Sequence, residues 1–80
     1  MMAGRPAAVG TIKLFDPAKG RGIITPQDVA RERGLPEALY FEVDLERAKW
    51  LRVGQLVQFV VEGTGKDAEA RDVNVLAEMA

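Results

Sequence analysis

Residues 10–26, GTIKLFDPAKGRGIITP, decide the fold because they have the pattern of two short strands joined by a turn. The first strand is expected over residues 9–16, where positions alternate with a period of two, as in a strand that is buried on one side. Ile12 and Leu14 fall on one side of this strand, and the opposite side carries Thr11, Lys13 and Phe15.

The turn is predicted at residues 16–20, DPAKG, because Pro17 fixes φ and Gly20 can adopt the positive φ that other residues avoid. The returning strand is expected over residues 21–25. Its alternation predicts an outward face that carries Arg21, Ile23 and Thr25. The segment as a whole therefore predicts a β-hairpin.

The same alternation predicts three more strands, at residues 39–43, 57–61 and 70–76. Phe41 and Phe59 fall on the apolar sides of their strands, so both are expected in the core. With no room for a second layer, five short strands must bury one face against itself. The expected fold is therefore an all-β, small closed or nearly closed barrel.

Two segments do not alternate and instead predict a turn or two of helix in the loops. Residues 28–34, DVARERG, lie between an N-cap candidate, Asp28, and a C-cap candidate, Gly34. Residues 45–53, LERAKWLRV, have apolar positions at helical spacing. Trp50 in this second segment is expected to cap the barrel, since indole is large and amphipathic.

The composition limits the chemistry that the chain can perform. Its 80 residues are 48% hydrophobic and 29% charged, which suits one small domain, and the sequence contains neither Cys nor His. Disulfides and thiolate zinc sites are excluded, and the commonest general base is missing. No long apolar run indicates a membrane span or a signal peptide. We expect a cytoplasmic protein without a metal or other cofactor.

The net charge of −1 hides an asymmetry along the chain. Residues 1–34 carry six basic and three acidic side chains, whereas residues 35–80 carry five basic and nine acidic ones. A phosphate backbone responds to the local potential rather than to the total charge. The first half can therefore present a basic face, to which Arg31 and Arg33 would contribute.

Residues 10–24 resemble the opening of the cold-shock domain, whose pattern is roughly G-x-V-K-W-F-N-x-x-K-G-F-G-F-I, with Asp16 in place of the usual Asn. Residues 39–43, LYFEV, look like the second motif of that family, V-F-V-H-F. Residues 54–63 are similar to its fourth strand, and Ala70 and Val73 fit its closing A-x-x-V. The positions of the first motif that match in register are Gly10, Lys13, Phe15, Lys19, Gly20, Gly22 and Ile24.

The resemblance covers residues 9–76 and implies a five-stranded antiparallel barrel of the oligonucleotide-binding (OB) type, with one or two short helical turns in its loops. A flexible N-terminus is expected over residues 1–8 and a tail over residues 77–80. In that family, aromatic rings on two adjacent strands stack on single-stranded bases, and lysines beside them meet phosphates. The resemblance thus implies a non-enzymatic protein that binds single-stranded RNA or DNA.

Most of the family's rings are replaced in this sequence. Leu14 stands at the Trp position, and the aromatic or His positions that follow are occupied by Arg21, Ile23, Glu42 and Val43. Only Phe15 and Tyr40 keep a ring, so we expect weak binding. The residues expected to contact nucleic acid are Lys13, Phe15, Lys19, Arg21, Ile23 and Tyr40.

Two other classes of function compete with this interpretation. Leu14, Ile23 and Val43 would form an aliphatic patch suited to a protein partner or a homodimer. An enzyme is the weakest hypothesis, because the carboxylates of Asp44 and Glu46 form no recognisable acid/base pair with a nucleophile.

Overall fold

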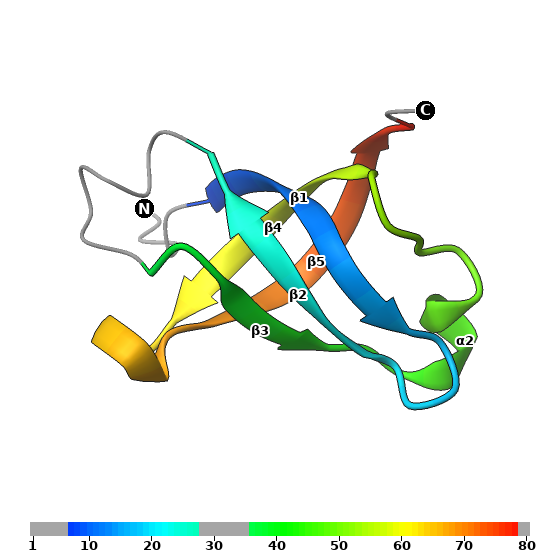
Figure 1. The fold of residues 1–80 in the computed structure, drawn as a ribbon, viewed down its shortest axis with the longest axis horizontal. Helices are drawn as coiled ribbons and strands as arrows, with labels where there is room; N and C mark the ends of the chain where they lie inside the picture. The colour runs from blue at the N-terminus through cyan, green and yellow to red at the C-terminus, as the bar shows by residue number, and fades with distance from the viewer. Residues whose placement is uncertain (1–6, 28–35, 79–80) are drawn as a thin grey trace, which may run out of the picture.

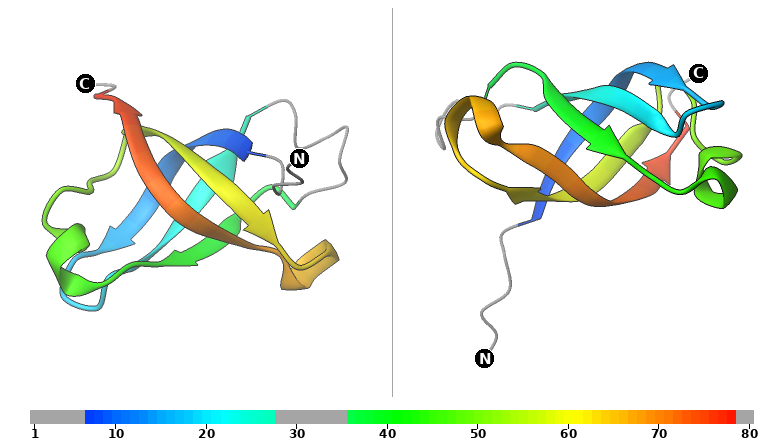
Figure 2. Two further views of the ribbon diagram at one scale, coloured as in Figure 1. Left: turned by 180° about the vertical axis from the view of Figure 1, so that it is seen from behind. Right: turned by 90° about the horizontal axis from the view of Figure 1, so that it is seen from below.

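A computed structural model of the chain describes residues 7–27 and 36–78. Five strands form a closed barrel in the order β1-β2-β3-β5-β4 (Figure 1). They are β1 (Ala7–Asp16), β2 (Arg21–Pro26), β3 (Leu39–Glu42), β4 (Leu56–Glu62) and β5 (Glu69–Ala77). The expected all-β barrel of OB type is confirmed, and Figure 2 shows how the strands wrap around a common interior.

One pairing in the barrel departs from the antiparallel arrangement. β3 and β5 run parallel, and their register joins Tyr40 to Glu69 and Phe41 to Ala70. The other neighbouring strands pair in antiparallel fashion. The local alternation predicts strands but not their directions, so this closing pair was not visible in the sequence.

The helical segments are short. The turn expected within residues 45–53 is present as α2 (Leu45–Ala48), and a 3-10 turn, η1 (Gly65–Asp67), connects β4 to β5. The turn expected at residues 28–34 lies outside the described residues, and so do Arg31 and Arg33. In the described part of the chain, neither helical segment has the length and apolar character needed to cross a membrane.

All five strands contribute side chains to the core inside the barrel. Phe41 and Phe59, both expected there, are fully buried. The other large apolar side chains that are almost completely inaccessible are Ile12, Ile24, Leu39 and Val57. Burial of this apolar surface is the main force that stabilises the fold, at about 25 cal/mol per Å².

A β-bulge in β1 changes the side on which two residues lie. Ile12 pairs with Ile24, but Leu14 pairs with Ile23, so Lys13 is an extra residue in the strand. Leu14 is consequently 60% exposed instead of sharing the buried side of Ile12, and Phe15 packs against the core. The sides predicted for Leu14 and Phe15 are therefore wrong, because a period of two cannot reveal an inserted residue.

The predicted turn between β1 and β2 is confirmed. The backbone N–H of Gly20 donates to the carbonyl of Asp16 at 2.8 Å, and Gly20 has φ +68°. Val43 donates its backbone N–H to the carbonyl of Gly20 at 2.7 Å, and a Cβ on Gly20 would lie 2.3 Å from the Val43 carbonyl oxygen. The glycine thus lets the hairpin turn lie directly against the end of β3.

Candidate nucleic-acid interface

β1, β2 and β3 lie side by side and form the front of the barrel in Figure 1. Residues directly opposite each other on neighbouring strands project from the same face of a sheet. The registers therefore produce two transverse rows on the outer surface. We call them the apolar row, Leu14–Ile23–Tyr40, and the charged row, Asp16–Arg21–Glu42.

The apolar row places one aromatic ring beside two aliphatic side chains. Leu14 is largely exposed, whereas Ile23 and Tyr40 are half-buried. Part of the Tyr40 side chain is therefore accessible on the outer surface of the sheet, with Ile23 beside it. This row is therefore suited to a flat apolar ligand such as a base.

The charged row places a guanidinium between two carboxylates. Arg21 lies opposite Asp16 on one side and opposite Glu42 on the other, and all three are exposed. Over residues 7–27 and 36–78, neither the Arg21 guanidinium nor the Glu42 carboxylate has a hydrogen bond or an ion pair. Asp16 accepts a hydrogen bond from the backbone N–H of Ala18 at 3.0 Å, which stabilises the turn.

Two lysines that were expected to contact nucleic acid lie beside these rows. Lys13 is the exposed bulge residue directly before Leu14, and Lys19 is exposed in the turn that leads to Arg21. Neither ammonium group has a partner in the described part of the chain. The structure therefore places three cations, Lys13, Lys19 and Arg21, around the outer face of the hairpin.

Phe15, another residue expected to contact nucleic acid, lies on the inner side of β1. Its ring stacks on that of Phe41, with the ring centroids 5.8 Å apart and an interplanar angle of 2°. Phe15 pairs with Gly22, where a Cβ would lie only 2.8 Å from the Phe41 ring. Phe15 is thus half-buried against the core, and Tyr40 supplies the ring on the outer rows.

The aliphatic patch proposed as an alternative is smaller than the sequence suggested. Leu14 and Ile23 are neighbours on the outer surface, but Val43 is partly buried and packs against the core. Of these three residues, only Leu14 and Ile23 therefore contribute to the aliphatic surface on the outside of β1 and β2.

The prediction that Trp50 caps the barrel is wrong, since its side chain is 71% exposed. Its neighbour Leu51 is buried instead and joins the core. The loop is fixed by Gln55, which is 2% exposed: its Oε1 accepts the N–H of Arg52 at 2.9 Å, and its Nε2 donates to the carbonyl of Trp50 at 3.0 Å. The same Nε2 donates to the Glu78 carboxylate at 2.8 Å. These bonds hold the backbone while the indole points outward.

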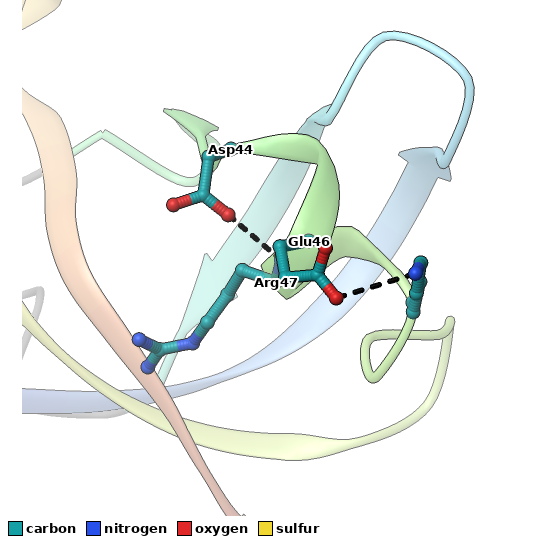
Figure 3. Close-up of polar contacts among 4 residues, drawn as sticks. Asp44, Glu46 and Arg47 are labelled. Carbon is teal, nitrogen blue, oxygen red and sulfur yellow. Dashed lines mark hydrogen bonds and ion pairs between the residues drawn. The ribbon is translucent and has the colours of Figure 1, made fainter.

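The carboxylates of Asp44 and Glu46 stabilise the helical turn (Figure 3). Asp44 caps α2, because its Oδ1 accepts the backbone N–H of Arg47 at 2.8 Å. Glu46 pairs with Lys49 at 3.2 Å. Arg47 donates to the carbonyl of Val73 and to the side chain of Asn74, and it thereby ties α2 to β5.

A closed five-stranded barrel of OB type, with an aromatic ring and several cations on the outer face of its first three strands, is the architecture of the cold-shock class. The sequence comparisons agree with this class. The chain is 35% identical over 69 residues to a cold shock-like protein of Aquifex aeolicus (strain VF5), and the match covers 86% of this chain and 94% of that protein. The chain therefore belongs to the cold-shock domain family. No family model matches the sequence.

Proposed function

We propose that the chain is a non-enzymatic, cytoplasmic protein that binds single-stranded RNA or DNA through the outer face of β1, β2 and β3. The observation that carries this proposal is the apolar row, in which the partly exposed Tyr40 side chain lies beside Ile23 and near cations that have no partner among the described residues. An aromatic ring can stack on any base, and each stack contributes about 1–3 kcal/mol. Lysine and arginine side chains beside it would neutralise phosphates.

The same geometry supports weak binding. Tyr40 is the aromatic member of the two rows, and the Phe15 ring is occupied by its contact with Phe41. The loss of two or more stacks removes several kcal/mol relative to a face with a full set of rings, at about 1–3 kcal/mol per base. The carboxylates of Asp16 and Glu42 also repel a phosphate backbone. We expect dissociation constants in the micromolar range or weaker.

The experiment is a titration with a fluorescently labelled uridine heptamer at several salt concentrations. The affinity should fall as the salt concentration rises, because phosphate neutralisation releases counterions. Tyr40→Ala should weaken binding about tenfold, the loss of one stack. Lys66→Ala is a control for a surface substitution outside the proposed face: it removes an exposed cation from η1 and should change the affinity little. Nanomolar binding that is insensitive to salt would contradict the proposal.

The exposure of Leu14 beside Ile23 favours a second candidate, a protein-interaction or homodimerisation surface. The test is sedimentation of the wild type and of Leu14→Asp over a range of concentrations. A dimer that dissociates in this variant, together with no binding of oligonucleotides at low salt, would favour the interaction surface over nucleic-acid binding.

A further inference from the structure

Glu42 lies beside the one ring of the outer rows. It follows Tyr40 by two residues on β3, so both side chains project from the same face, about 7 Å apart at the rise of roughly 3.3 Å per residue in a strand. The cross-strand neighbour of Tyr40 on β2 is Ile23, which has no polar group. On β3 itself, the hydrogen-bonding side chain nearest to the ring is the Glu42 carboxylate; on β5, Glu69 lies opposite Tyr40.

The carboxylates near Glu42 differ in whether they are already used. Asp44 accepts the N–H of Arg47, and Glu69 lies 4.0 Å from the guanidinium of Arg71. The carboxylate of Glu42 has no hydrogen bond or ion pair with any described residue. Glu42 also lines a hollow of about 170 Å³ on the side of β5, together with Glu69 and Arg71.

An ionised carboxylate only accepts hydrogen bonds, so it discriminates among bases by their donors. The pairing edge of guanine presents the N1–H and the 2-amino group side by side, and the two oxygens of one carboxylate match these two donors. Adenine and cytosine present one amino group next to a ring nitrogen that accepts. Uracil presents one N–H between two carbonyl oxygens, which the carboxylate repels.

We infer that Glu42 makes this face select guanine: a guanine stacked on Tyr40 donates its N1–H and 2-amino hydrogens to the Glu42 carboxylate. This inference rests on the proposed single-strand binding and adds the base that the site reads. One well-aligned bidentate contact discriminates against other bases by about tenfold or more, which corresponds to the usual 1–3 kcal/mol. Arg21, directly opposite Glu42, supplies the positive charge that lets a polyanion approach this carboxylate.

The experiment uses the full chain and uridine heptamers with one central base that is guanine, inosine, 7-deazaguanine, adenine, cytosine or uracil. The guanine heptamer should bind at least tenfold more tightly than the all-uridine heptamer. Inosine keeps the N1–H but lacks the 2-amino group, so it should fall between the two. 7-Deazaguanine keeps the whole pairing edge and should equal guanine.

Glu42→Gln is the decisive variant, because the amide keeps the size of the side chain but replaces one acceptor oxygen with a donor. The preference for guanine should fall to about threefold or less, and the affinity for the all-uridine heptamer should stay the same or rise as the negative charge disappears. Glu46→Gln is the matched control, since Glu46 is an exposed carboxylate on α2 that is paired with Lys49. It should keep the full preference.

The outcomes separate this inference from the proposed function. Equal affinities of the wild type for all six heptamers, or an undiminished guanine preference in Glu42→Gln, would overturn the inference and leave single-strand binding intact. Binding of none of the heptamers, even at low salt, would overturn the proposed function and the inference together.

Discussion

Replacing Arg21 and Ile23 together with Phe should restore an aromatic surface on the outside of β2. Both side chains project outward, because each lies opposite an outward residue of β3: Glu42 for Arg21 and Tyr40 for Ile23. The inward neighbour Gly22 is untouched, so the core contact with Phe41 remains. We expect the stability to change by no more than about 1 kcal/mol, as for other surface substitutions.

The gain in affinity follows from the number of stacks. Tyr40 provides one ring on this face, and the double variant adds two. At about 1–3 kcal/mol per stacked base, even one recovered stack of about 1.4 kcal/mol makes binding tenfold tighter. The slope of log K against log salt should become shallower by about 0.7, because one potential phosphate contact of Arg21 is lost. The gain must therefore come from stacking and not from charge.

The assay is fluorescence anisotropy with a labelled uridine heptamer at four salt concentrations. Ile23→Phe alone should raise the affinity without changing the salt slope, which separates the two effects. Gln58→Phe adds a ring on β4, outside the three-stranded face, and should have no effect on affinity. If the double variant shows no gain while its NMR spectrum reports an intact fold, the outer face of β2 does not bind nucleic acid.

Three further predictions concern stability and the environment of the indole. Gly22→Ala should destabilise the fold by about 1–3 kcal/mol in urea unfolding, because its Cβ would lie 2.4 Å from the Leu14 carbonyl oxygen and 2.8 Å from the Phe41 ring; an unchanged midpoint would contradict the packing described. Gln55→Ala should cost about 2 kcal/mol or more, measured in the same way, because buried backbone groups lose their partners. Trp50→Ala should leave stability within about 0.5 kcal/mol, and the emission maximum of the wild type should be that of a solvated indole; a blue-shifted maximum would speak against the exposed position.

The barrel was predictable because its determinants are local. Alternation over residues 39–43 identified β3 and the burial of Phe41, and the DPAKG segment identified the turn at Gly20. The bulge at Lys13 was not predictable, because it is defined by pairing with β2 and leaves no change in composition. The parallel pairing of β3 with β5 likewise depends on how distant segments meet.

The candidate site was predicted only in part, because strand alternation is visible in the sequence and the bulge is not. Ile23 and Tyr40 were placed correctly on adjacent strands, whereas the bulge moved Phe15 inward and Leu14 outward. Trp50 was expected to cap the barrel because indole is large and amphipathic, but its neighbour Leu51 is the residue that joins the core. The burial of Gln55 was not predicted, because a polar side chain is expected at the surface unless its hydrogen-bond partners are known. These partners are Arg52, Trp50 and Glu78.

The parallel pair that closes the barrel is also its shortest contact between strands. Two residue pairs join β3 to β5, whereas six join β1 to β2 and six join β4 to β5. Local openings begin where the fewest bonds must break at once, so amide hydrogens along this seam should exchange faster than those of the hairpin. Tyr40 lies on the seam, opposite Glu69. A ligand stacked on the Tyr40 ring binds only while the seam is closed, so its binding should slow amide exchange at the seam. Hydrogen exchange at these few amides would then measure ligand binding without any label.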